Sequence, residues 1–166
     1  MKVFINRKPI EGPWGGGNLL VKNLYAHSTG FGITMVDNPV DADLLFLFDP
    51  RPGNTGVGVN EIIKVSKEKS IPILHRVNEC DARKATQGVD AQLAECSKYT
   101  DATVFVSRWM KNYHLESGWH NDNTNVVING VDSDHFNNGS EFKFNNGKIN
   151  LVTHHWSNNR LKGFDV

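Results

Sequence analysis

Short hydrophobic runs alternate along this chain with segments in which hydrophobic residues recur at helical spacing. Runs rich in β-branched and aromatic residues predict strands; these are 2–6, 33–36, 44–48, 71–74, 102–106, 125–128 and 149–152. The amphipathic segments between them predict helices; these are 17–28, 60–69, 89–99 and a segment that ends near residue 116. Ser107 is placed to cap the last helix, because its side-chain oxygen can accept a hydrogen bond from a first-turn N–H.

The regular alternation of strands and helices predicts an α/β fold, namely a Rossmann-like, mostly parallel sheet with helices on both faces. The segment 44–48 is hydrophobic throughout, which indicates a strand covered on both faces. Ligands of such folds bind at the carboxyl ends of the strands, so we expect the functional residues in the loops that follow the strands. Those loops are 14–18, 49–53, 75–84, 107–109 and 129–132.

The sequence balances 18 Lys and Arg against 18 Asp and Glu, so its formal net charge is zero. Proteins that bind nucleic acid usually carry a basic excess, and a nucleic-acid partner is therefore not expected. The hydrophobic share of 39% and the charged share of 22% are typical of a soluble globular domain. No hydrophobic run approaches the roughly 18 residues of a membrane-spanning helix, and the first residues do not form a signal peptide. We expect a cytoplasmic protein without a transmembrane segment; peripheral membrane contact is left open.

Cysteine and histidine residues are too few and too scattered to form a disulfide framework or a structural metal site. Cys80 and Cys96 lack the spacing of either, so we expect both to be reduced thiols. His154 and His155 are adjacent, and adjacent residues of a strand point to opposite faces of a sheet. We therefore predict no metal site.

Three glycines and an asparagine stand where the first predicted helix begins: Gly15, Gly16, Gly17 and Asn18. Glycines at a helix start let backbone N–H groups approach an anion or a sugar hydroxyl closely. These four residues are therefore candidates for substrate binding; a flexible turn is the alternative. A dinucleotide-binding enzyme is disfavoured, because its glycine motif follows the first strand directly. Asp37 could supply the acidic residue of such a motif, but the glycine spacing does not fit.

The segment 75–84 (HRVNECDARK) begins where a predicted strand ends and is strongly polar. His75 is the candidate catalytic residue, because an imidazole there could act as a base or bind a substrate hydroxyl. The same segment offers further candidates for substrate binding: Arg76, Asn78, Glu79, Asp81 and Arg83. The alternative is a solvated loop stabilised by salt bridges.

Near the carboxyl end, the alternation of hydrophobic strands and helices gives way to a turn motif and a polar segment. The segment NGVD at 129–132 predicts a tight turn, with Phe136 as a packing anchor after it. A polar stretch rich in Asn and Gly follows at 137–148 and has the composition of a surface loop or linker. We therefore expect a Rossmann-like domain at 1–147 and the beginning of a second domain at 148–166.

Taken in order, these motifs resemble those of family-4 glycosyltransferases, which have the two-domain GT-B fold. The segment 129–132 with Phe136 is similar to the N-G-V-D…F signature near the end of that family's N-terminal domain. The loop 15–18, the segment 75–84 and the S-x-W at 107–109 resemble further stretches of these enzymes. The segment 149–166 resembles the first strand, loop and helix start of their C-terminal, donor-binding domain. The resemblance thus spans nearly the whole chain.

The resemblance implies that this chain is the N-terminal, acceptor-side part of an enzyme that moves a sugar from a nucleotide-diphosphate donor to a hydroxyl acceptor. It implies retention of the sugar's configuration, no metal and no cofactor beyond the nucleotide-sugar substrate. His75 would contact the transferred sugar or the acceptor, and Ser107 would join the loop 15–18 in binding substrate. Lys162 would hold the donor diphosphate, although His155 and Trp156 stand where the family carries an arginine.

Because most of the donor-binding domain would be missing, we expect the 166-residue chain alone to be inactive. The alternative function is a non-catalytic module that binds a glycan or an anion. The sequence leaves open the donor nucleotide, the sugar, the acceptor and the oligomeric state.

Overall fold

Six strands form one sheet in the computed structural model, which describes residues 1–12 and 14–130. They are β1 (Lys2–Ile5), β2 (Thr34–Val36), β3 (Leu44–Leu47), β4 (Ile73–Val77), β5 (Ala102–Phe105) and β6 (Thr124–Val126). Their order is β2-β1-β3-β4-β5-β6, and every neighbouring pair is parallel. The predicted α/β fold is confirmed. The strand predicted at 149–152 and the domain boundary predicted at 147/148 lie outside the described residues.

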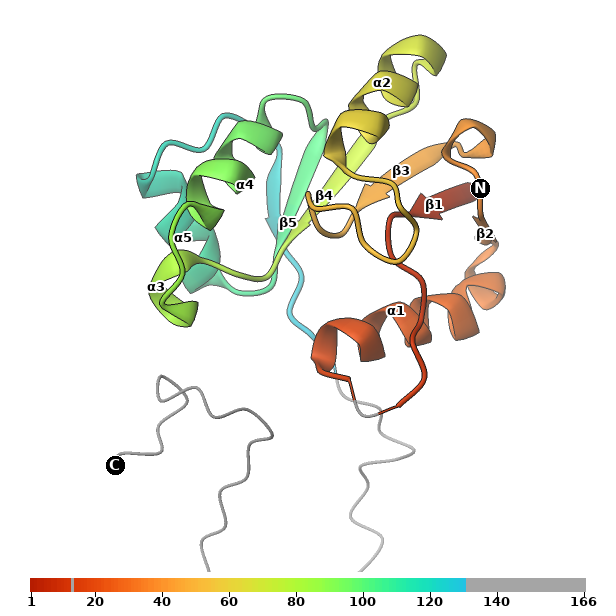
Figure 1. Ribbon diagram of the computed structural model, residues 1–166, viewed down its shortest axis with the longest axis horizontal. Helices are drawn as coiled ribbons and strands as arrows, with labels where there is room; N and C mark the ends of the chain where they lie inside the picture. Colours follow the sequence, from red (N-terminus) through yellow and green to blue (C-terminus); the bar gives the residue numbers. More distant parts are fainter. Residues whose placement is uncertain (13, 131–166) are drawn as a thin grey trace, which may run out of the picture. The chain divides into compact units, whose positions relative to one another are not determined.

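Helices cover both faces of the sheet, as predicted. They are α1 (Gly16–His27), α2 (Val59–Lys69), α3 (Asp81–Lys84), α4 (Val89–Ser97) and α5 (Arg108–Glu116), with two short 3₁₀ helices, η1 (Ser28–Phe31) and η2 (Pro39–Asp41). α1 lies on one side of the sheet, and α2 and α4 lie on the other (Figure 1). Right-handed crossovers explain this arrangement, because the chain moves outward from β1 to β2 but in the opposite direction from β3 to β6.

The core lies between the sheet and the layer formed by α2, α4 and α5. A first hydrophobic cluster lies under α2; its members include Phe4, Leu45, Leu47, Ile62, Val65 and Ile73. A second lies under α4 and α5; its buried members are Val77, Cys80, Leu93, Phe105 and Met110. The strand β4 contributes to both clusters and therefore joins the two halves of the core.

The position of β4 differs from the prediction, which placed a strand at 71–74 and a polar loop carrying the candidate site from residue 75. The strand instead extends from Ile73 to Val77, and His75 lies opposite Leu47 of β3 and Thr103 of β5. Pairing on both sides decides where a central strand ends, and polar residues inside it do not interrupt the ladder. His75 and Arg76 are consequently buried strand residues.

Two smaller predictions are confirmed. Ser107 caps α5, since its Oγ accepts a hydrogen bond from the Met110 amide at 3.1 Å. Cys80 and Cys96 are free and buried. Burial raises the pKa of the Cys96 thiol to about 11, which keeps it protonated and unreactive.

Candidate functional site

The carboxyl ends of the described strands lie at one edge of the sheet, because all of these strands are parallel. At that edge β1 is the switch point of the topology, with β2 on one side of it and β3 on the other. Ligands of open α/β sheets bind at such a point. The residues that follow β1 and β3, namely Asn6, Arg7 and Asp49, lie at this position.

Asn6 is fully buried and joins the end of β1 to the loop after β3. Its Nδ2 donates to the carbonyl oxygens of Asp49 (2.5 Å) and Val57 (3.3 Å), and its Oδ1 accepts from the Phe48 amide (2.8 Å). The Thr55 hydroxyl donates to the Asn6 carbonyl at 3.1 Å. A side-chain amide offers both donors and acceptors, so this one residue fixes the loop and thereby the position of Asp49.

The Asp49 carboxylate is held by two arginines. Arg7 Nη2 donates to Oδ2 at 2.8 Å, and Arg51 donates through its backbone N, Nε and Nη2 at 2.7–2.9 Å. Burial would by itself raise the pKa of Asp49, but the hydrogen bonds and positive charge of Arg51, with Arg7, outweigh it and hold the pKa below the usual value. Asp49 therefore stays ionised and is suited to accept hydrogen bonds rather than to donate a proton.

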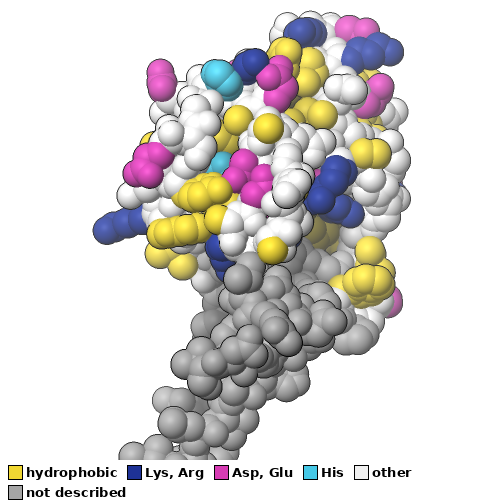
Figure 2. Space-filling model, turned by 60° about the vertical axis from the view of Figure 1, so that its left-hand side comes forward, with side chains coloured by type: hydrophobic (Ala, Val, Ile, Leu, Met, Phe, Trp, Pro, Cys, Tyr) yellow, Lys and Arg dark blue, Asp and Glu magenta, His cyan; other side chains and the backbone are white. Residues whose placement is uncertain are grey.

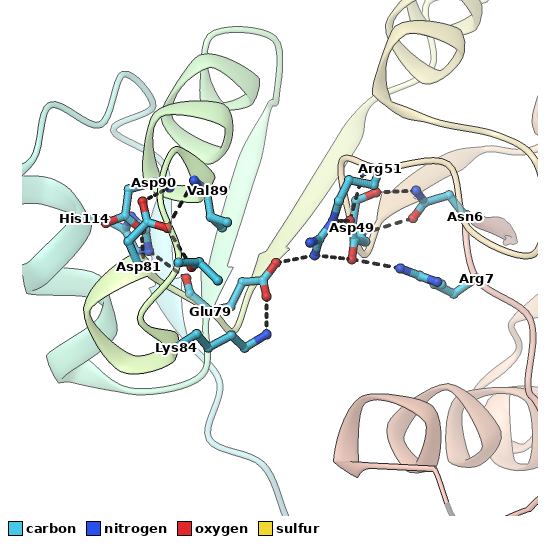
Figure 3. Close-up of polar contacts among 11 residues, drawn as sticks. Asn6, Arg7, Asp49, Arg51, Glu79, Asp81, Lys84, Val89, Asp90 and His114 are labelled. Carbon is cyan, nitrogen blue, oxygen red and sulfur yellow. Dashed lines mark hydrogen bonds and ion pairs between the residues drawn. The ribbon is translucent and has the colours of Figure 1, made fainter. Parts of the chain in front are cut away.

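Arg51 also reaches the loop after β4. Its Nη2 donates to Glu79 Oε1 at 2.5 Å, and the other oxygen of Glu79 pairs with Lys84 of α3 (Figure 3). The two carboxylate side chains are only 13% (Asp49) and 9% (Glu79) exposed, whereas the three cations are 30–50% exposed. We call these five residues the switch-point network: Arg7, Asp49, Arg51, Glu79 and Lys84. Its acids lie inside and its cations face outward, with one cation more than there are acids.

The glycine loop approaches the same edge from α1. Gly15 is the N-cap of α1, which has no side-chain cap and no acidic residue in its first turn. A Cβ added to Gly17 would lie 3.6 Å from the ring of Phe48, the residue before Asp49. Arg76 lies over that ring, with Cζ 4.9 Å from its centroid. The structure thus brings Gly17 and Arg76, both predicted site residues, close to the ring of Phe48.

Asn18, the fourth residue of the predicted glycine motif, has a structural partner. Its Oδ1 accepts from the Ile10 amide and its Nδ2 donates to the Ile10 carbonyl, both at 2.8 Å. This pair of bonds ties the loop after β1 to the first turn of α1. Gly15, Gly16 and Gly17 take no left-handed backbone conformation, so glycine is not required there by the backbone angles.

His75 lies in the middle of β4 rather than at its end, and its side chain is fully buried. Its ring stacks on Trp119, with centroids 5.9 Å apart and an interplanar angle of 20°. Neither ring nitrogen has a hydrogen-bond partner among the described residues. Burial, and secondarily the charge of His114, lower the pKa of His75 to about 4, so the ring is neutral at physiological pH.

Asp81 has a capping function in the structure. Its carboxylate accepts hydrogen bonds from the Thr86 hydroxyl (2.7 Å) and from the amides of Val89 (3.2 Å) and Asp90 (3.1 Å), at the start of α4. The Asp81 amide in turn donates to Asp90 Oδ1 at 2.9 Å. The bond from Thr86 and those from the backbone amides hold the pKa of Asp81 below its usual value. These bonds use the acceptor capacity that the sequence had assigned to a substrate.

Of the remaining predicted residues, some lie at the edge of the sheet and others lie outside the described residues. Asn78 is half-buried in the loop after β4, and Arg83 is exposed on α3. The Ser107 hydroxyl oxygen is occupied as the cap of α5. Lys162, Phe136 and the residues 154–156 lie outside the described residues.

Four residues of the switch-point network were not singled out from the sequence: Arg7, Asp49, Arg51 and Lys84. Asp49 and Arg51 belong to a loop predicted to be functional, and a signal for them exists in the run DPR directly after the most hydrophobic strand. Arg7 and Asn6 follow the first strand directly, and the same rule about strand ends would have identified them.

Neither a metal site nor a membrane span is evident in residues 1–12 and 14–130. No group of three or more His, Cys, Asp or Glu residues in that part of the chain is arranged to hold a metal ion. No helix described there has both the length and the hydrophobicity that crossing a bilayer requires.

The fold is similar to that of Anabaena Alr3699/HepE, a protein of known structure. The crystal structure of Anabaena Alr3699/HepE in complex with UDP and glucose matches with a TM-score of 0.56 and 11% identity, over 81% of this chain and 46% of that chain. Its structures with UDP and with UDP-glucose match with TM-scores of 0.54 and 12% identity, over 81% of this chain and 45% of that chain. This chain therefore spans about half the length of that protein, and its fold matches half of a GT-B glycosyltransferase.

No protein-family model matches the sequence, and no curated protein sequence matches it significantly. The resemblance to a nucleotide-sugar glycosyltransferase therefore rests on structural similarity alone.

Proposed function

We propose that this chain forms the acceptor-side half of a glycosyltransferase that uses a nucleotide-sugar donor. The observation that carries the proposal is the match of 81% of the chain to one half of a protein whose structures contain UDP, UDP-glucose or glucose. The matching half has its own polar site at the switch point, where folds of this kind bind ligands. We further propose the finer assignments, namely transfer of a hexose, retention of configuration and kinship with family 4.

In this proposal the switch-point network binds the acceptor. Asp49 and Glu79 offer carboxylate oxygens as acceptors at the edge of the sheet, and Arg7, Arg51 and Lys84 present N–H donors outward. Hydroxyl groups both donate and accept hydrogen bonds, so a polyhydroxylated acceptor fits such a mixed surface. The network, rather than the buried His75, is the group that we expect to touch the acceptor.

The donor phosphate is the leaving group, and negative charge develops on it in the transition state. The N-terminus of α1, a helix of 12 residues without an acidic first turn, offers backbone N–H groups to such a charge. Lys162 remains our candidate for a second positive group there. No metal is needed in this scheme.

The test compares two proteins, the 166-residue chain and the full product of the reading frame from which it comes. Both are incubated with radiolabelled UDP-glucose, and separately with other nucleotide sugars, in the presence of a panel of sugar acceptors. We expect transfer by the full product and none by the 166-residue chain alone. Transfer by the short chain would contradict its proposed role as one half of a catalytic unit. If the reading frame ends at Val166 and no transfer occurs, the non-catalytic binding module becomes the better description.

A further inference from the structure

An exposed tryptophan lies at the carboxyl edge of the sheet, in the first turn of α5. Trp109 stacks on Tyr113 one turn later, with ring centroids 5.3 Å apart and an interplanar angle of 23°. Although Tyr113 covers one face of the indole, the residue remains 51% exposed. The outer face of a large aromatic ring is thus presented to solvent at the edge where this fold binds its ligands.

Tyr113, on which the indole stacks, is held by several contacts. The Tyr113 hydroxyl donates to Asp90 Oδ2 at 2.5 Å, and this bond is the main reason that the pKa of Tyr113 is raised to about 12. Tyr113 also meets His114 edge to face, at a centroid distance of 5.3 Å. His114 in turn donates through Nε2 to the Glu79 carbonyl at 3.1 Å. The tyrosine on which the indole stacks is therefore tied, through His114, to the loop that carries Glu79 of the switch-point network.

The ring contacts continue into the core. His114 stacks on Phe105 and meets Trp119, and Trp119 lies against both Phe105 and His75. Trp109 is the solvent-exposed end of this series of rings. A ring that already stacks on a neighbour loses less conformational entropy when a ligand covers it than a side chain that rotates freely. Trp109, which stacks on Tyr113, is such a ring.

We propose that Trp109 is a stacking surface for a pyranose ring of the acceptor. This inference rests on the proposed function and adds a subsite to it. The C–H face of a pyranose is flat and apolar while its rim carries hydroxyls, and so it matches an indole face set among charged groups. The face of the molecule over α3, α4 and α5 shows this mixture, with hydrophobic side chains beside acidic and basic ones (Figure 2).

A membrane surface fits this site less well. Interfacial helices bury a continuous apolar face in the headgroup region. The residues of α5 that share a face with Trp109 are Asn112, Tyr113 and Glu116, and Asn112 and Glu116 are exposed and polar. An indole beside exposed polar residues suits one sugar ring better than a lipid layer.

The experiment uses the 166-residue chain labelled with ¹⁵N, in which four tryptophans give four indole N–H signals. Maltose, cellobiose and UDP are titrated separately to millimolar concentration, and the Trp109 signal is assigned from a Trp109→Phe variant. We expect a disaccharide to shift the Trp109 signal. We expect Trp109→Ala to weaken its binding about tenfold, and Trp109→Phe to stay within about threefold of the parent.

Phe31→Ala is the matched control, because Phe31 is 81% exposed and lies in η1, before β2, at the opposite edge of the sheet. We expect it to bind the disaccharide as the parent chain does. The inference is overturned if neither disaccharide shifts the Trp109 signal, if Trp109→Ala binds as tightly as the parent, or if UDP alone shifts that signal.

Because this measurement requires no catalysis, it separates the two proposals. If a disaccharide binds at Trp109 but the full product of the reading frame transfers no sugar, the Trp109 subsite is supported and the proposed glycosyltransferase activity is refuted. If the full product transfers sugar and Trp109→Ala leaves its KM for the acceptor unchanged, the proposed glycosyltransferase activity is supported and the Trp109 subsite is refuted.

Discussion

Two carboxylates with little exposure, Asp49 and Glu79, hold three loops of the carboxyl edge together through their ion pairs with Arg7, Arg51 and Lys84. Each acid is satisfied by charged donors, and a buried carboxylate in that situation stabilises its surroundings. Arg51 is central to the arrangement, because it pairs with both acids at once. The positions of the loops after β3 and β4 are thus coupled through one guanidinium.

Replacing Glu79 by Gln should cost about 2 kcal/mol of unfolding free energy, since a buried charged acceptor is lost to both Arg51 and Lys84. Urea denaturation measures the change. The control is Glu95→Gln, which removes an exposed acid paired with Lys98 and should cost less than about 1 kcal/mol. Equal effects of the two substitutions would show that the network contributes no more than a surface pair.

His75 should make stability depend on pH. Its folded-state pKa of about 4 lies below the value of about 6.5 in an unfolded chain, so between these values the unfolded state binds more protons. Stability is therefore fully present above about pH 6.5 and falls as the pH drops toward 4, by on the order of 3 kcal/mol. Urea denaturation across this range measures the fall.

A His75→Leu variant serves as the control for that measurement. Leucine does not titrate, and it has no polar atoms that would be buried without a hydrogen-bond partner. The variant should therefore be stable and should lose this part of the pH dependence. An unchanged slope between pH 4 and 6.5 in His75→Leu would assign the effect to other groups.

For single residues, the sequence predicted which segments are polar but not which of their side chains face solvent. The predicted residues Glu79 and Arg76 do lie at the carboxyl edge. His75 does not, because two further residues of β4 pair with β5, and the alternation of side chains then turns the imidazole into the core. Asp81 and Ser107 likewise bond to nearby backbone amides, and such local capping competes with ligand binding for the same oxygen atoms.

Among the elements, the C-terminus of α2 contains a residue in a costly conformation. Ser70 has φ +56° at the C-cap of the helix, and its amide donates to the Ser66 carbonyl. Glycine is the residue that adopts this left-handed conformation without a steric penalty. Ser70→Gly should therefore raise the unfolding free energy by about 1 kcal/mol.

The comparison for Ser70→Gly is Glu68→Gly, an exposed position inside α2. Glycine there should cost about 1 kcal/mol. Thermal or urea denaturation of both variants measures the difference in sign. A loss of stability in both would show that the backbone at residue 70 is not strained.

The elements that the sequence predicted best are the ones with strong hydrophobic periodicity. α2 and α5 begin and end within about a residue of their predicted bounds. α3 was not predicted, because a helix of four residues between two loops has no periodicity to detect. β4 was misplaced because its carboxyl half is polar, and its extent depends on the strands on either side of it.

For the molecule as a whole, β4 links two hydrophobic clusters, one under α2 and one under α4 and α5. We expect the described sheet to unfold as one unit for that reason. Ile62→Ala in the first cluster and Met110→Ala in the second should each cost 2–5 kcal/mol, about the range for such truncations. In both variants the far-UV circular dichroism and the tryptophan fluorescence, to which Trp119 of the second cluster contributes, should change at the same urea concentration.

Separate transitions in Ile62→Ala would count against a single cooperative unit. In that case the circular dichroism would change first, while the fluorescence would change at the urea concentration seen for the parent chain.

Among the described residues, the carboxyl edge of the parallel sheet carries the two longest connections between strands and helices, the segments 6–15 and 48–58. Asn6, Asp49 and Val57 anchor these segments, through buried hydrogen bonds, ion pairs and packing on the first cluster. Their exposed positions, such as Lys8, Glu11 and Pro52, take no part in the strand register or in either cluster. A descendant of this chain could therefore acquire a new ligand preference by changing exposed loop positions while keeping its scaffold, and a library restricted to those positions would sample specificity at little cost in stability.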